Sequence, residues 1–175
     1  MRQHLVLTAT GSDRPGLVER VTRLIVEHGG NVESSRMARL GGEFAMLVLV
    51  AAPVERIGGL REAVDRLGEG SYVVHTRLTG MGPPVAAEGR VTIRVLGADH
   101  MGIIHAVARD LARRSVNVET LDTEVAAAPM SGQPLFRMQA TVSLPPGLSR
   151  EELARALEAV GDEMNVEITV EPTGG

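Results

Sequence analysis

The first 80 residues alternate between two hydrophobic periods, one typical of strands and one typical of helices. Apolar and polar residues alternate over residues 3–10, and apolar residues then recur every three or four positions from Leu17 to Ile25, which predicts a strand followed by a helix. The pair Gly41–Gly42 predicts a tight hairpin between two further extended segments. The expected strands are residues 3–10, 31–40, 43–50 and 71–79, and the expected helices run from Pro15 to Gly29–Gly30 and from Pro53 to Gly68.

The second half of the chain repeats this order, at a constant offset of 86 residues over its first part. In this repeat Gly11, Asp13, Gly16, Val21 and Asn31 match Gly97, Asp99, Gly102, Val107 and Asn117 in turn. The second copy has a longer excursion, residues 128–134, in place of the tight hairpin. Its last helix begins with a capping box of Ser149 and Glu152. An internal repeat of this kind indicates two domains.

The β-α-β-β-α-β order predicts an α+β fold for each half. Such a unit is an antiparallel four-stranded sheet with two helices on one face, the ferredoxin-like arrangement. Residues 81–89 are rich in glycine and proline and show no period, which is typical of a linker. We expect a first domain at residues 1–80, a linker at 81–89, a second domain at 90–172 and a frayed tail at 173–175.

The turn between the first strand and the first helix of each unit is a candidate ligand site. In the first unit it is Gly11–Leu17, and in the second it is the matching segment 97–103. A helix start carries N–H groups without intrahelical partners and the positive end of the helix dipole, so it suits a carboxylate or another anion. A glycine in the first helical turn, Gly16, costs roughly 0.5–1 kcal/mol relative to alanine. We expect close approach of backbone or ligand to explain its presence.

Composition and charge exclude several classes of function. The net charge of −4 and the pI near 5.7 give no electrostatic footprint for nucleic acid. The absence of cysteine excludes disulfides and thiol chemistry and is compatible with a reducing cytosol. No apolar run predicts a signal peptide or a membrane span. We therefore expect a cytoplasmic protein that binds neither DNA nor membranes directly. Its small aromatic-poor cores favour further burial between the two domains or between chains, and we expect a homo-oligomer.

The segment Gly11–Val18, followed by Glu27-His28-Gly29-Gly30-Asn31-Val32, resembles the ACT domain, a small regulatory module that typically responds to amino acids. Two such ACT units cover nearly the whole chain. The Gly41-Gly42-Glu43-Phe44 hairpin and the excursion before Phe136 are further similar to the glycine cleavage system transcriptional repressor family.

This resemblance implies a site for a small amino acid, with glycine as the first candidate, where the turn of one unit faces a neighbouring unit. It implies that the backbone of the turn and the asparagine that starts the next strand hold the amino-acid end of the ligand. In the second unit His100 and Met101 replace Arg14 and Pro15. The ligand-binding residues carried over are Gly11, Ser12, Asp13, Arg14, Pro15, Gly16, Leu17 and Asn31 in the first unit, and Asp99, Gly102, Ile103 and Asn117 in the second.

Several of these residues have a purely structural interpretation that the sequence leaves open. Asp13 and Asp99 are also suited to be helix N-caps, and both asparagines are suited to stabilise a turn. His100 and His105, with Asp99, suggest a metal or acid–base site. However, the spacing of the two histidines puts them on different faces of a helix, and no known metal motif is present. We expect no cofactor, no metal and no catalytic residue.

The leading hypothesis is a regulator without enzymatic activity that binds a small amino acid and passes the bound state to a protein partner. If it regulates transcription, as the resemblance implies, the acidic charge and the lack of a helix-turn-helix favour action through a DNA-binding activator. Two alternatives remain open. One is a ligand-independent interaction module whose sheet edges pair between chains, and the other is an enzyme built on His100, His105 and Asp99.

Overall fold

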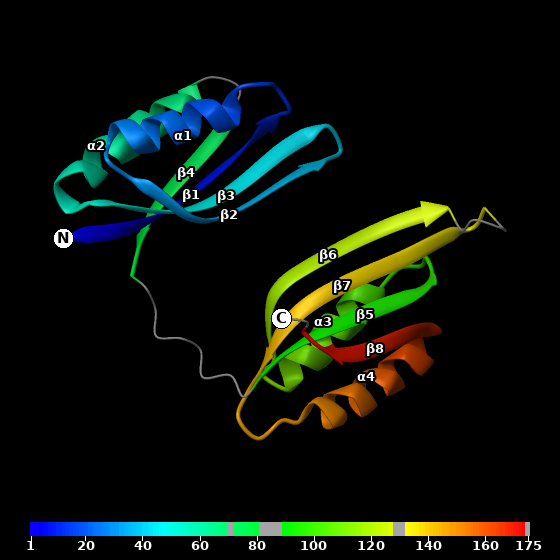
Figure 1. Ribbon diagram of the computed structural model, residues 1–175. Coiled ribbons are helices and arrows are strands. Elements are labelled where there is room, and N and C mark those ends of the chain that lie inside the picture. The colour runs from blue at the N-terminus through cyan, green and yellow to red at the C-terminus, as the bar shows by residue number, and fades with distance from the viewer. Residues whose placement is uncertain (70–71, 81–88, 128–131, 174–175) are drawn as a thin grey trace. The chain divides into compact units, whose positions relative to one another are not determined.

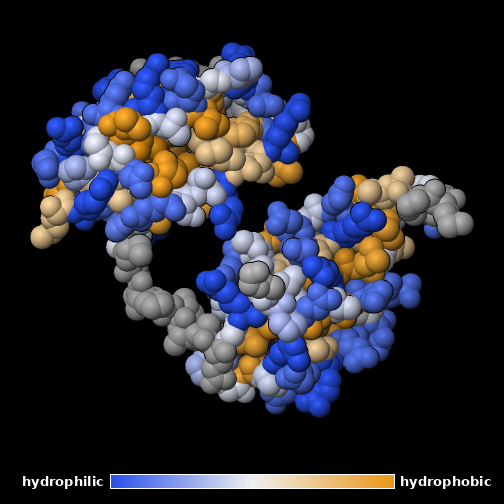
Figure 2. Space-filling view, viewed as in Figure 1, coloured by the Kyte–Doolittle hydropathy of each residue, from blue (hydrophilic) through white to orange (hydrophobic). Residues whose placement is uncertain are grey.

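The computed structural model describes residues 1–69, 72–80, 89–127 and 132–173, and it confirms the expected fold class. The chain divides into two compact units, Met1–Pro83 and Pro84–Gly175, each of which is described by itself. In each unit two helices cover one face of a four-stranded antiparallel sheet (Figure 1). In Figure 2 hydrophilic residues make up most of the visible surface of each unit, with hydrophobic residues in smaller groups between them.

The first unit has the strand order β2-β3-β1-β4. Its sheet faces the helices with the alternate apolar residues of β1, Leu5, Leu7 and Ala9, all fully buried. Helix α1 meets them with one apolar stripe that includes Val21 and Ile25. The elements are β1 (Arg2–Ser12), α1 (Leu17–Glu27), β2 (Asn31–Leu40), β3 (Glu43–Pro53), α2 (Val54–Asp65), the short 3-10 helix η1 (Arg66–Glu69) and β4 (Tyr72–Thr79).

The second unit has the equivalent strand order β6-β7-β5-β8. The predicted capping box opens its last helix, because Ser149 Oγ accepts the N–H of Glu152 (3.2 Å) and Glu152 Oε2 accepts the N–H of Ser149 (2.9 Å). The elements are β5 (Gly89–Ala98), α3 (Ile103–Arg113), β6 (Asn117–Ala127), β7 (Pro134–Leu144), α4 (Arg150–Met164) and β8 (Val166–Pro172).

Each sheet has a second face that no described element of its own unit covers, and we call it the open face. Strand residues alternate between the two faces. In β3, Met46 and Val48 are buried under the helices, whereas Leu47 between them is 47 % exposed on the open face. The nearly continuous apolar run of β3 therefore supplies apolar side chains to both faces of the first sheet.

The hairpin of the first unit agrees with the sequence, whereas Gly89, expected in the linker, and Pro134, expected in the excursion, are already the first residues of β5 and β7. Gly41 and Gly42 both have positive φ, 60° and 90°, as a two-residue hairpin requires. Most of the expected linker, residues 81–88, and most of the excursion at 128–134 lie outside the described residues. Residues 174–175 also lie outside them, and Thr173 donates its N–H to the carbonyl of Arg90 (3.4 Å). No helix among the described residues is long and apolar enough to span a membrane.

Candidate functional site

The start of helix α1 has no side-chain cap. The helix begins at Leu17, its N-cap is Gly16, and the first bond to the cap runs from the N–H of Arg20 to the carbonyl of Gly16 (3.0 Å). The N–H groups of Leu17, Val18 and Glu19 therefore lack intrahelical partners. Together with the positive end of the helix dipole, they form a place where a small anion gains hydrogen bonds.

The interpretation of Asp13 as the N-cap is wrong. The chain enters the helix three residues later, at Gly16, whose φ of 99° makes the turn. Asp13 instead donates its backbone N–H to the carbonyl of Gly42 (3.3 Å), and its carboxylate pairs with Arg39 Nε (3.1 Å). The capping interpretation of Asp99 fails for the same reason, because Gly102 with φ 97° is the N-cap of α3.

Of the two reasons expected for Gly16, close approach of backbone or of ligand, the structure does not show the first. A Cβ built at this position would meet no described heavy atom within 4 Å, so no close approach of backbone explains the glycine. The positive φ does, since residues with a Cβ rarely adopt it. The sequence repeat indicates that both units need a residue with positive φ here, because Gly102 occupies the matching position before α3 with nearly the same φ.

A hollow of about 290 Å³ lies beside the uncapped helix start. Its lining includes one carboxylate and one guanidinium, from Asp13 and Arg14. Arg14 forms no ion pair within the described parts of the chain, and the pair of Asp13 with Arg39 is largely exposed. The hollow therefore offers both signs of charge to a zwitterion. Its full lining is Asp13, Arg14, Pro15, Gly16, Leu17, Val18 and Phe44.

Asn31 does not lie near this hollow in its own unit. Gly11 of the turn pairs with Phe44, whereas Asn31 pairs with Ala51, seven residues further along β3. Seven strand residues span about 23 Å. One small molecule cannot touch both the turn and Asn31 of the same unit. Asn117 has the same relation to the second turn, since its partner is Ser143 while Gly97 pairs with Phe136.

The second turn has the same backbone but different neighbours. His100 Nε2 donates to the carbonyl of Met164 at the end of α4 (2.7 Å). The terminal carbon of Met164 lies 3.7 Å from the place where a Cβ of Gly102 would be. Asp99 donates its N–H to the carbonyl of Pro134 (3.1 Å). The end of α4 thus contacts the second turn, whereas the first turn is open at Gly16.

No metal site is found within the described ranges, where no three His, Asp or Glu side chains converge. The ring of His100 is bound to the backbone of Met164, and His105 is exposed on α3. The described residues therefore give the hypothesis of an enzyme built on these histidines no geometric support.

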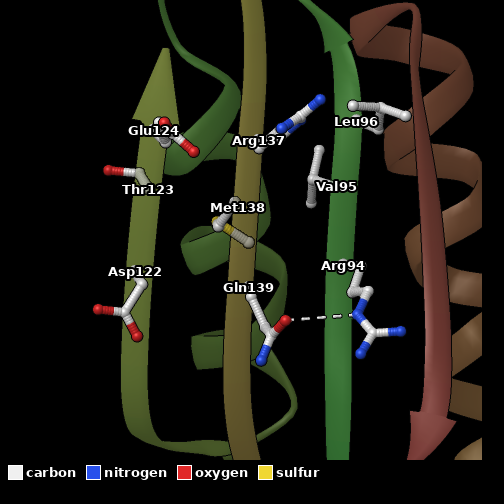
Figure 3. Close-up of a pocket in the computed structure, with 9 residues that line it drawn as sticks. All are labelled: Arg94, Val95, Leu96, Asp122, Thr123, Glu124, Arg137, Met138 and Gln139. Carbon is white, nitrogen blue, oxygen red and sulfur yellow. Dashed lines mark hydrogen bonds between the residues drawn. The ribbon is translucent and has the colours of Figure 1, made fainter. Parts of the chain in front are cut away.

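A larger hollow, of about 430 Å³, lies on the open face of the second unit and was not expected from the sequence (Figure 3). Arg94 lies in it, and its guanidinium is already engaged by Glu171 (2.6 Å) and Gln139 (3.4 Å). On the same sheet, the hydroxyl of Ser143 and then the guanidinium of Arg90 hold the pKa of Glu119 below its ordinary value. This face carries several charged side chains, and their charges partly satisfy one another.

Comparison with known proteins finds one family and several relatives. A family model described as the ACT domain matches residues 3–71. The chain is 26% identical to the glycine cleavage system transcriptional repressor of Escherichia coli over 167 residues, which cover 95% of this chain and 88% of that protein. It is 29% identical to the phosphoserine phosphatase SerB2 of Mycobacterium tuberculosis over 175 residues, but these cover only 41% of that enzyme.

The fold recurs over the full length of a solved structure. The crystal structure of an unknown protein from Galdieria sulphuraria is 34% identical and has a TM-score of 0.86. The match covers 99% of this chain and 100% of that one. The order of two such units in tandem is therefore shared with the full length of that crystallised chain.

Proposed function

The chain belongs to the ACT-domain family, and we propose that it is a regulator without enzymatic activity that binds a small amino acid at its first strand-to-helix turn. The observation that carries this proposal is the uncapped start of α1 beside a hollow that contains both a carboxylate and a guanidinium. An amino acid presents the complementary pair, a carboxylate and an ammonium group.

The ligand carboxylate would receive the free N–H groups of Leu17 and Val18. The helix dipole adds about 0.3–1 kcal/mol at such a position, and the guanidinium of Arg14, which forms no ion pair with any described residue, adds a flexible donor. The ammonium group would bind the carboxylate of Asp13, which has acceptor capacity beyond its single exposed contact with Arg39. Gly11, Ser12, Pro15 and Gly16 would shape the backbone around the ligand.

We propose that Asn31 reaches the ligand from a second copy of the chain. Within one unit it lies about 23 Å from the turn, so a homo-oligomer is the arrangement in which it can contribute. A side-chain amide both donates and accepts, which suits either end of an amino acid. The functional unit would then be an assembly of chains rather than a monomer.

The first turn would be the main binding site. At the second turn, His100 is bound to the carbonyl of Met164, and the side chain of Met164 lies next to Gly102. His100 also replaces Arg14, so this turn has no guanidinium at that position. The helix start of α3 is thus the poorer anion site of the two. Asp99, Gly102 and Ile103 would then preserve the fold of the turn rather than form a second site, and Asn117 would serve as the first residue of β6, far from that turn.

The relative from Escherichia coli is a transcriptional repressor by name, which supports a role in the regulation of amino-acid metabolism. Glycine is the first ligand to test. The net charge of −4 disfavours direct binding to DNA, so we propose that this protein acts in the cytoplasm by contacting a DNA-binding activator. The bound amino acid would shift the equilibrium between partner-binding states by its difference in affinity for them.

A thermal-shift panel of the common amino acids, followed by calorimetry on those that respond, tests the proposal. We expect glycine or another small amino acid to raise the melting temperature. Asp13→Ala and Asn31→Ala should each weaken binding about tenfold or more, since a hydrogen bond to a charged group contributes about 1.5–3 kcal/mol. Both residues are exposed, so the fold should remain.

The repeat offers matched controls for both variants. Asp99→Ala and Asn117→Ala change the equivalent positions of the second unit and should leave the affinity unchanged. No response to any amino acid would contradict the proposal and favour the ligand-independent interaction module. Equal losses from the first-unit and second-unit variants would show that the assignment to the first turn is wrong.

A further inference from the structure

The open face of the first sheet carries apolar side chains at its centre. Val6 of β1 and Leu49 of β3 are direct cross-strand partners, and Leu47 lies two residues along β3 on the same face. We call these three residues the apolar strip. They line a hollow of about 210 Å³ together with Arg36 and two serines of β2. Exposure of apolar side chains to water is unfavourable, so a partner that covered this surface would gain favourable free energy of burial.

The second unit shows that this fold does not need an apolar strip. By the repeat and the strand pairing, Thr92, Gln139 and Thr141 occupy the positions of Val6, Leu47 and Leu49. The same four-stranded sheet thus forms with polar residues at all three places. The apolar side chains of the first unit have no structural counterpart there, which points to a role outside the fold of the unit.

Cations flank the strip on both sides. Arg36 of β2 pairs with Leu47, and Arg77 of β4 pairs with Val6, so both lie on the open face at its two edges. Three strand spacings separate β2 from β4, which is about 14 Å. Neither guanidinium has an acidic partner within the described residues, and the carboxylate of Glu33 is paired with His4 (3.1 Å).

We propose that the open face of the first unit binds an amphipathic helix of a partner protein, with acidic residues on both flanks of its apolar side. A helix is about 10–12 Å across with its side chains, so one lying along the strip would bring its flanks to Arg36 and Arg77. Two copies of this face do not complement each other. Packing them together would bring the guanidinium groups of one copy close to those of the other, and these like charges repel.

This inference deepens the proposed function, since it locates the surface that would meet the protein partner. It uses none of the residues at the amino-acid site. The turn and the strip are therefore tested by separate variants, and each of the two proposals stands or falls by its own measurement.

The probe is a synthetic amphipathic peptide of about five helical turns, with leucines and one tryptophan on one side and glutamates on both flanks. The chain has no tryptophan, so the emission of the peptide reports its own surroundings. We expect a blue shift on titration with the full chain. A matched peptide with lysines in place of the glutamates should bind about tenfold more weakly or not at all, and salt should weaken the glutamate peptide.

Two variants of the full chain separate the apolar and the ionic parts. Leu47→Gln with Leu49→Thr installs the residues of the second unit and should keep the fold while weakening binding at least about tenfold. Arg36→Glu with Arg77→Glu changes only exposed side chains and should reverse the preference between the two peptides. The matching change in the second unit, Gln139→Leu with Thr141→Leu, should leave binding of the peptide to the first unit unchanged.

The proposal is overturned if the glutamate peptide binds no better than the lysine peptide, or if either first-unit variant binds it as the wild type does. It is also overturned if Leu47→Gln with Leu49→Thr converts an oligomer to a monomer in analytical ultracentrifugation, because the face would then be a contact between copies. If the peptide binds but no amino acid changes the melting temperature, the proposed docking surface stands and only the proposed amino-acid site is rejected.

Discussion

Replacing Gly16 by alanine tests whether backbone conformation or space determines this residue of the first turn. Gly16 has φ 99°, and a Cβ there would meet no described heavy atom within 4 Å. Any loss of stability must then come from the conformation alone. For a residue with a Cβ, the left-handed region costs about 1–2 kcal/mol. We expect Gly16→Ala to lower the free energy of unfolding of the first unit by that amount.

Gly58 is the matched control in the same unit. It lies on the exposed side of helix α2, its φ is not positive, and a Cβ there also meets nothing within 4 Å. Alanine is favoured over glycine in a helix interior by about 0.8–1 kcal/mol. Gly58→Ala should therefore stabilise the unit, although both substitutions add the same methyl group to open space.

Urea denaturation followed by tyrosine fluorescence measures both effects in the full chain. Tyr72, the single tyrosine, is buried in the core of the first unit and no tryptophan masks its emission, so the signal reports that unit. Opposite shifts of the two midpoints are the expected result. A neutral or stabilising Gly16→Ala would refute the conformational explanation and return the residue to a role in ligand approach.

Two further substitutions test the second unit. Gly97→Ala would place its Cβ 2.5 Å from Cγ1 and 3.1 Å from Cα of Val166, so it should destabilise this unit by about 1–3 kcal/mol, seen by circular dichroism while the Tyr72 transition stays unchanged. The hydroxyl and N–H of Ser149 lower the pKa of Glu152, so the capping box stabilises α4 fully above the ordinary pKa of about 4.3 and loses its effect as the pH falls through the lowered folded value. Glu152→Gln should flatten that part of the stability profile between pH 3 and pH 6, and an unchanged profile would show that the carboxylate does not act there.

Periodicity predicts most of this fold because each sheet is covered on only one side by its own helices. The alternation of Leu5, Leu7 and Ala9 and the helical stripe of α1 both report which face is buried. The capping box at Ser149 and the hairpin at Gly41–Gly42 were recognisable because their residue types are specific to these geometries.

The candidate site was harder to predict, because its geometry depends on φ angles and on strand register. Aspartate is a common N-cap, so Asp13 fitted that role in the sequence, and only the positive φ of Gly16 moves the helix start past it. Similarly, Asn31 follows the turn closely in sequence. Once β2 runs back along β3, however, the asparagine begins the strand at the opposite end of the sheet.

The duplication separates what the fold requires from what function adds. Positions that agree between the units include the positive-φ glycines Gly16 and Gly102, which the turn requires in both. Positions that differ are free of that requirement, and two groups of them bear on binding. One is the turn, where Arg14 gives way to His100, and the other is the open face, where the apolar strip gives way to threonines and a glutamine. Both differences favour binding by the first unit, and we therefore propose that this unit carries the ligand site and the docking surface of a ligand-controlled adaptor.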